Sequence, residues 1–501
     1  MTSRTPNARA ASGNFIRVAR DNWTLEESQT GKRFVPFGCN YYDAHTGWPP
    51  QVWNRFDPAA VQQDFRKMED LGVNAIRVWL QWSVFMPSVE KLSMKAVDQC
   101  HTVLSFARDS GIRVNLTGPE FWEGYPRWLS PNEVQGYQHF VNAKYMDAHA
   151  TFWELFAGHF AEETIIYGFD LANEPFMPWD GEDLRRLWNQ WLNGRYGSAR
   201  MVRCAWGRST PGGLRMGEVP PPPNRRVPGS RYLVDYQTFR EEMACRWTRN
   251  TVGAIRRKDQ NHLITVGLHQ SGCPLEEIIP SRYTAFNPHL LKEFLDYISL
   301  HWYPFGNPLT AACQPFDLPR SMEQSMSVFL ANCRYSYAGK PLLLEECSYY
   351  GGGSPLFWGG VLPHRTENEQ EKFSRRFISV SKGSVGGWLN WPLQDTEKST
   401  DTSAYGGLYT ATGELKPWGR SFRTIGGRIK GKHLRREAAR VLVPASRMVL
   451  LTDWGACEKI LQRCYRLHLR GTVWDFKRHT FEEQQGVRES RRAAEAAEDV
   501  S

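Results

Sequence analysis

The sequence lacks the marks of a disulfide-stabilised or membrane-spanning protein. Its 10 cysteines are scattered over 501 residues without a CxxC pair, which excludes a disulfide framework and favours buried thiols in a reducing compartment. No apolar stretch approaches the ~20 residues that cross a bilayer. The N-terminus, residues 1–9, also lacks the apolar core of a secretory signal. We therefore expect a soluble, cytoplasmic protein without a membrane partner, and secretion stays open if the N-terminus is incomplete.

Most of the chain also lacks an excess of charge of either sign. The net charge is +9, but residues 421–501 hold 17 Lys and Arg against 10 Asp and Glu, which leaves only +2 for the rest. A nucleic-acid surface needs a basic stripe on a folded module, and no motif of such a module is present. We therefore expect no nucleic-acid partner.

Apolar and amphipathic runs alternate from residue 33 onward. Eight apolar runs predict strands at 34–41, 73–80, 112–117, 165–172, 262–268, 296–301, 341–346 and 385–391. The runs between them predict helices at 58–71, 93–110, 137–161, 236–257, 321–333 and 367–381. Eight strands that alternate with helices predict an α/β protein, a (β/α)8 TIM barrel, whose active site lies at the C-terminal ends of the strands.

The chain is expected to divide into one large domain and smaller terminal parts. Residues 1–20 are predicted to be a disordered tail and 21–427 the catalytic barrel. A short, basic α/β appendage is predicted at 428–480, with strands at 448–451 and 471–476 around a helix at 456–469. The charged, alanine-rich residues 481–501 predict disorder or a frayed helix.

One connection, residues 185–231, is unusually long and contains four consecutive prolines. Connections of this length are commonly functional, so we expect it to cover the mouth of the barrel. Its Trp188, Trp191 and Trp206 would either line a binding cleft or only attach the excursion to the barrel.

Two predicted strands end in carboxylates. Asn173-Glu174-Pro175 follows strand 165–172, and Glu345-Glu346 ends strand 341–346. A retaining glycosidase needs one carboxyl group to protonate the leaving oxygen and another to attack the sugar from the opposite face. Because side chains alternate along a strand, we expect only one of Glu345 and Glu346 to face the barrel mouth.

The joint order of several motifs resembles the clan-A glycoside hydrolases, especially the cellulase- and mannanase-like glycoside hydrolase family 5. Asn173-Glu174-Pro175 is similar to the acid/base motif on strand four, and Glu346 to the nucleophile on strand seven. The other similarities are Arg77 on strand two, His301 and Tyr303 after strand six, and Trp391 on strand eight.

This resemblance implies a retaining mechanism with Glu174 as acid/base and Glu346 as nucleophile. It implies that Arg77 and Tyr303 keep Glu346 ionised and that Asn173 binds the sugar 2-hydroxyl. It also implies that His301 orients the site or touches substrate and that Trp391 stacks on the sugar. Two carboxylates suffice for this chemistry, so we expect neither a metal nor an organic cofactor.

The chain departs from the family pattern in two places. Residues 117–124 lack the usual histidine, which makes Glu120 and Trp122 candidates for sugar contacts, although a structural salt bridge suits Glu120 equally well. Cys347 follows the nucleophile position, where an aromatic residue is usual. These departures and the long connection resemble the mannan- and mannoside-active members, and to a lesser degree family 42 β-galactosidases. We therefore expect a β-mannan or β-mannoside substrate, ahead of β-glucosides and β-galactosides.

Two further expectations concern an alternative function and the C-terminal segment. Because a fold does not guarantee a function, a catalytically inactive carbohydrate-binding protein on the same barrel is the second hypothesis. The segment 448–476 resembles the beginning of the Rossmann-like domain that follows the barrel in family 42 enzymes. We expect it to pack against the flank of the barrel or to form a weak homo-oligomer contact.

Overall fold

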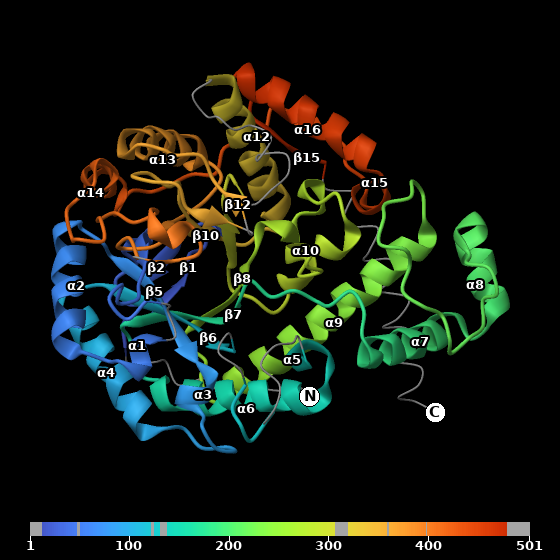
Figure 1. Cartoon of the computed structure of the whole chain (residues 1–501), viewed down its shortest axis with the longest axis horizontal. Coiled ribbons are helices and arrows are strands. Elements are labelled where there is room, and N and C mark those ends of the chain that lie inside the picture. The colour runs from blue at the N-terminus through green and yellow to red at the C-terminus, as the bar shows by residue number, and fades with distance from the viewer. Residues whose placement is uncertain are drawn as a thin grey trace, which may run out of the picture.

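The computed structural model describes residues 13–47, 51–121, 125–130, 138–305, 319–357, 360–396 and 398–477. Eight parallel strands close into a barrel with helices around it (Figure 1). In barrel order they are β4 (Phe37–Asn40), β5 (Ala75–Gln81), β6 (Arg113–Glu120), β7 (Ile166–Asn173), β8 (Leu263–Leu268), β9 (Ile298–Trp302), β10 (Leu342–Cys347) and β13 (Trp388–Asn390). The predicted (β/α)8 TIM barrel is confirmed, and each predicted strand overlaps one barrel strand.

The helices around the barrel include one at every predicted amphipathic run, together with helices that were not predicted at 51–54, 82–85, 288–291 and 417–429. They are α1 (Gln51–Asn54), α2 (Pro58–Asp70), α3 (Trp82–Phe85), α4 (Met94–Asp109), α5 (Gln138–Val141), α6 (Ala143–Phe160), α9 (Arg231–Arg256), α10 (Pro288–Leu291), α12 (Pro319–Ser336), α13 (Glu367–Ser381) and α14 (Pro417–Ile429). The predicted single helix 137–161 is divided at Asn142, because its side chain accepts from Lys144 N–H and starts α6. None of the helices in the described ranges is both long and apolar enough to cross a membrane.

A small antiparallel sheet lies at the N-terminal end of the barrel. Its strands are β1 (Ile16–Val18), β2 (Leu25–Glu27) and β3 (Arg33–Phe34). Ile16 is 1% exposed and packs with residues at the starts of barrel strands, among them Tyr167 and Leu343. The prediction of a disordered tail is therefore wrong for residues 13–20, because this short strand buries its apolar side chains under the barrel. Residues 1–12 lie outside the described residues.

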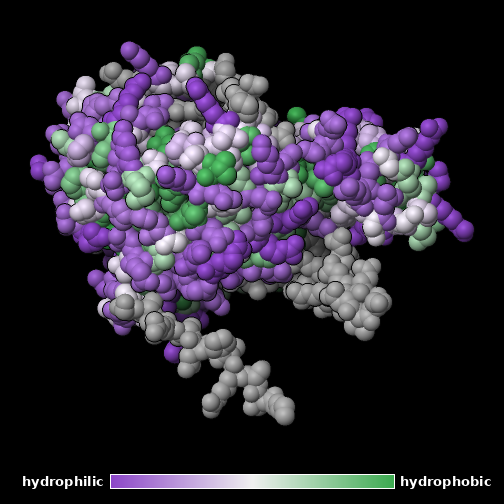
Figure 2. Space-filling model, turned by 90° about the horizontal axis from the view of Figure 1, so that it is seen from below, coloured by the Kyte–Doolittle hydropathy of each residue, from purple (hydrophilic) through white to green (hydrophobic). Residues whose placement is uncertain are grey.

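The long connection folds into two helices, α7 (Glu182–Tyr196) and α8 (Ala199–Trp206), which lie beyond α9 rather than over the barrel mouth (Figure 1). Figure 2 shows this part as a largely hydrophilic lobe beside the barrel. Trp188 and Trp206 are buried, with parallel rings whose centroids are 6.2 Å apart. Trp188 also packs on Tyr236 and Phe239 of α9. The tryptophans therefore attach the lobe to the barrel, which is the second of the two expected roles.

The C-terminal segment contains β14 (Val441–Val443), α15 (Arg447–Thr452), α16 (Trp454–Leu469) and β15 (Trp474–Phe476). The predicted strand 448–451 is wrong: these residues form α15, which begins where the Ser446 side chain accepts from Val449 N–H. The two strands pair in parallel, α16 packs on α12, and α15 packs on α9. The appendage thus lies against the flank of the barrel. The tail 481–501 lies outside the described residues.

A short hairpin, formed by β11 (Leu356–Phe357) and β12 (Gly360–Val361), follows β10.

Candidate active site

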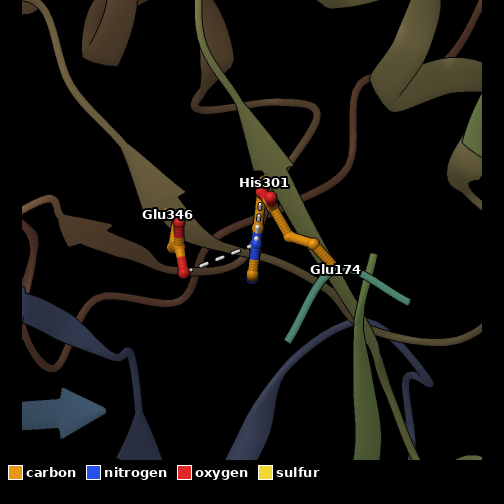
Figure 3. A group of neighbouring side chains, drawn as sticks. All are labelled: Glu174, His301 and Glu346. Atoms are coloured by element: carbon orange, nitrogen blue, oxygen red, sulfur yellow. Dashed lines mark hydrogen bonds and ion pairs between the residues drawn. The ribbon is translucent and has the colours of Figure 1, made fainter. Parts of the chain in front are cut away.

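The carboxyl ends of the barrel strands bring Glu174 and Glu346 together around a histidine (Figure 3). His301, on β9, places Nδ1 3.1 Å from Glu174 Oε1 and 3.5 Å from Glu346 Oε1. A carboxylate oxygen of Glu174 and one of Glu346 lie within 4.8 Å of each other. The sequence-predicted pair is therefore close enough to act on one sugar.

Arg77, on β5, connects Glu346 to strand β7. Its Nη1 donates to Glu346 Oε1 at 2.5 Å, and its Nε and Nη2 donate to Asp170 Oδ2 at 2.9 and 2.7 Å. Its Nη2 also donates to Asn173 Oδ1 at 2.8 Å. Because Arg77 is fully buried, each of these contacts is shielded from water. The guanidinium therefore orients both Glu346 and the amide that precedes Glu174.

The environments of the two carboxylates differ. Burial raises the pKa of Glu174 and of Glu346 above the usual range, and each carboxylate opposes ionisation of the other. Glu346 accepts from Arg77 and, at 2.8 Å, from Tyr303 Oη, and both contacts lower its pKa. Glu174 contacts His301 instead, and burial lowers the pKa of that imidazole well below its usual range. Glu346 thus has two donors that favour its ionised form, and Glu174 has neither of them.

The backbone at Glu174 is unusual. Its φ is 46°, in the left-handed region that residues other than glycine rarely adopt. The Glu174 N–H donates to Gly267 O at 2.8 Å, which holds this conformation against β8. The strand therefore ends abruptly, and the Glu174 side chain turns toward His301.

The expected alternation at Glu345 and Glu346 is broken. The register of β10 shifts between Leu344 and Glu346, so both carboxylates lie inside the barrel. Glu346 faces Arg77 and Tyr303, whereas Glu345 lies among Tyr167, Tyr297 and Asn115. Glu346, rather than Glu345, is therefore the partner of Glu174.

The remaining predicted residues are placed as follows. Glu120, at the end of β6, is buried and accepts from Asn173 N–H at 2.9 Å through Oε1, a contact with the main chain rather than the salt bridge considered above. Burial raises its pKa to about 8. Trp391 is 7% exposed, donates to Ser403 Oγ at 3.0 Å and packs edge-on against Trp79. Trp122 lies outside the described residues.

Two residues of the site escaped the sequence argument. Asp170 accepts from Arg77, from Thr117 Oγ1 at 3.1 Å and from Gly267 N–H at 2.6 Å. The sequence feature that could have indicated Asp170 is a single charged residue within an otherwise apolar strand. Gly267 left no signal, because its importance is the close approach of other side chains to its Cα.

Glu174, His301 and Glu346 also present three atoms that could ligate a metal ion. The cationic guanidinium of Arg77 already donates to Glu346, and its charge opposes a second cation at the same oxygen. The expectation of a metal-free site stays a prediction.

Paired carboxylates at the ends of two strands of a (β/α)8 barrel are the arrangement that a glycoside hydrolase uses. The model of glycoside hydrolase family 42, described as β-galactosidase, matches residues 48–371, and the chain belongs to this family. The resemblance to family 5 therefore holds at the level of the clan and not of the family.

Individual relatives are distant. The β-galactosidase YesZ of Bacillus subtilis (strain 168) is 24% identical over 321 residues, which are 60% of this chain and 45% of that protein. The chain thus spans less than half the length of this curated relative. Among solved structures, the exo-β-1,4-mannosidase Op5Man5 from Opitutaceae bacterium strain TAV5 has a TM-score of 0.62 and 15% identity over 91% of this chain and 71% of its own. A β-galactosidase from Halorubrum lacusprofundi has a TM-score of 0.67 and 18% identity over 88% and 66%. At these identities the structures support the fold.

Proposed function

We propose that this chain is a retaining β-glycosidase that works by double displacement, with Glu174 as acid/base and Glu346 as nucleophile. The observation that carries the proposal is the short separation of the two carboxylates, since one oxygen of Glu174 lies within 4.8 Å of one oxygen of Glu346. Retaining enzymes place their carboxyl groups about 5–5.5 Å apart, and inverting enzymes about 6.5–9.5 Å apart to admit a water. The short separation favours direct attack by one carboxylate on the sugar.

In the first step, a Glu346 oxygen attacks the anomeric carbon while Glu174 gives its proton to the leaving oxygen, which forms a glycosyl-enzyme ester and releases the aglycone. In the second step, Glu174 accepts a proton from water, whose oxygen displaces Glu346 from the anomeric carbon. Arg77 and Tyr303 stabilise the carboxylate that leaves. Because Asn173 Oδ1 accepts from Arg77, its NH₂ group is oriented to donate to the sugar 2-hydroxyl.

The substrate is proposed to carry a terminal β-linked galactose or mannose. The matching family and the curated relative are described as β-galactosidases, whereas one of the similar structures is an exo-β-1,4-mannosidase. The sequence favoured a β-mannoside, and the comparisons make a β-galactoside an equal candidate. Arg77 and Tyr303 both donate hydrogen bonds to Glu346, as a nucleophile requires. These contacts support catalysis over the second hypothesis, an inactive carbohydrate-binding protein.

The test is a panel of p-nitrophenyl β-glycosides of galactose, mannose and glucose, with NMR detection of the first anomer released. We expect turnover of at least one glycoside and a β-configured first product. Glu346→Ala should abolish turnover. In Glu174→Ala, turnover should require an added nucleophile such as azide, which completes the second step without a general base.

The matched control is Glu241→Gln. Glu241 is a buried carboxylate on α9, outside the barrel, and 1% exposed. This variant should keep its activity. An α-configured first product would refute retention, and substantial activity in Glu346→Ala would refute the assignment of the nucleophile.

A further inference from the structure

Beneath the catalytic pair, the barrel interior holds a third carboxylate that double displacement does not use. Glu345 is 1% exposed. Its Oε1 accepts from Tyr167 Oη at 2.8 Å and from Tyr297 Oη at 3.0 Å, and Asn115 Nδ2 lies 3.1 Å from each of its oxygens. All three partners donate, which favours the ionised form, whereas burial raises the pKa of Glu345 to about 7. Glu345 is therefore ionised above neutral pH.

The hydroxyl group of Tyr297 has a defined direction. Asn115 Nδ2 donates to Tyr297 Oη at 3.1 Å, so the Tyr297 hydroxyl uses its own hydrogen toward Glu345. Burial raises the pKa of both Tyr167 and Tyr297 well above the usual range, which keeps both as neutral donors. The polar groups around Glu345 are therefore arranged for an anion.

Glu345 is also fixed through its main chain at the point where β10 shifts register. Its carbonyl accepts from Asn40 Nδ2 at 2.9 Å. Asn40 Oδ1 in turn lies 3.4 Å from Arg77 Nη1, the nitrogen that donates to Glu346. Glu345 is thus held at both ends, next to the residue that must face the barrel mouth.

The charges of this part of the barrel do not balance. Arg77 contacts Asp170 and Glu346 directly, and Glu345 adds a further attraction from below. When all three are ionised, the three carboxylates around one guanidinium leave an excess of negative charge under Glu174. Negative charge in a buried site opposes ionisation of a neighbouring acid and so favours its protonated form.

We propose that Glu345 is a positioning residue that holds Glu346 toward the barrel mouth and supplies the negative charge that keeps a proton on the catalytic pair. This inference rests on the proposed function, because it concerns the acid that protonates the leaving group. Glu345 acts through Glu346 and Glu174 and does not touch the sugar.

The test is the pH dependence of kcat/KM in Glu345→Gln, which removes the charge and keeps the shape. Both limbs of the profile should move to lower pH, because both members of the pair lose a repulsive neighbour. The expected shift where Glu345 is ionised is about 1.5 pH units, the order produced by a charge at roughly 8 Å with an effective dielectric constant of about 20. The control Glu241→Gln removes a carboxylate that also accepts from a tyrosine, Tyr283 at 2.6 Å, and it should leave both limbs in place.

A second variant protects the test against misfolding of the first. Tyr297→Phe removes one donor to Glu345 and makes that carboxylate easier to protonate, so the limbs should move in the same direction by a smaller amount. Active, folded Glu345→Gln with unmoved limbs would overturn the inference, and so would an equal shift in Glu241→Gln.

Failure of the proposed function is distinguishable. If no glycoside is turned over, the titration of ¹³C-labelled glutamate carboxyl groups can be compared between the wild type and Glu345→Gln. A lower midpoint of the catalytic pair in the variant supports the inference, and an unchanged midpoint overturns it, whatever the activity.

Discussion

Gly267→Ala should damage the site without replacing any of the proposed catalytic residues. A Cβ at this position would lie 2.8 Å from Arg77 Nη2, 2.8 Å from Asp170 Oδ2 and 2.9 Å from His301 Cε1. Contacts under 3 Å force something to shift, and these three side chains are all 0% exposed, so none can move into solvent. The methyl group therefore acts on the ion pair that orients Glu346.

The magnitude follows from the packing. Overpacking of a dense interior costs about 1–3 kcal/mol of unfolding free energy. A displacement of about 1 Å at a reacting group can cost on the order of 10²-fold in rate. We expect kcat/KM on the best aryl β-glycoside to fall by about that factor, with a lower thermal midpoint of unfolding.

The control is Gly272→Ala, five residues along the chain. There a Cβ would meet Phe286 O at 3.5 Å and Thr284 Oγ1 at 3.7 Å, which are ordinary van der Waals distances. This variant should keep activity within about two-fold of the wild type, because nothing has to move. Wild-type kcat/KM in Gly267→Ala would refute the argument that this glycine is required for the packing of Arg77.

Three other predictions follow from the buried charges. Burial raises the pKa of Glu120 from 4.5 to about 8, so the folded state keeps a proton that the unfolded chain loses. The stability of the wild type therefore falls as pH rises from about 4.5 to 8. Glu120→Gln should remove this contribution, so in urea denaturation the stability of the variant relative to the wild type should be higher at pH 8 than at pH 5. Tyr303→Phe removes a donor to ionised Glu346 and should raise the pKa of Glu346, so the acidic limb of kcat/KM should move to higher pH; an unmoved limb would contradict the contact. Arg447→Met breaks a two-contact ion pair, at 2.7 and 3.0 Å, with Glu241 and should cost about 3 kcal/mol of unfolding free energy in a thermal or urea melt. Because that pair lies outside the barrel, kcat/KM should stay within about three-fold, and a larger loss would show that the appendage supports the site.

Local patterns were enough to predict the frame of this protein. Each barrel strand is a short apolar run, and helices such as α2 and α13 lie within one or two residues of their predicted ranges, because amphipathic periodicity and capping side chains act over a few neighbouring residues. Glu174 and the Glu345-Glu346 pair were located by the same local information, since parallel barrel strands present their C-terminal ends at one face. The preference for Glu346 came from the family resemblance alone. The motif order identified the clan but not the family, because the markers report the chemistry of the site rather than the loops around it.

The sequence by itself determined the barrel, the carboxylate pair and Arg77 as their neighbour. Only the tertiary structure decided which of Glu345 and Glu346 faces Glu174, because a register shift in β10 depends on pairing with its neighbouring strands. It also revealed the contact of Asp170 with Arg77, which joins residues 93 positions apart. The N-terminal strand β1 and helix α15 were predicted wrongly for a related reason. Their short segments carry weak local signals, and packing against the barrel decides what they become.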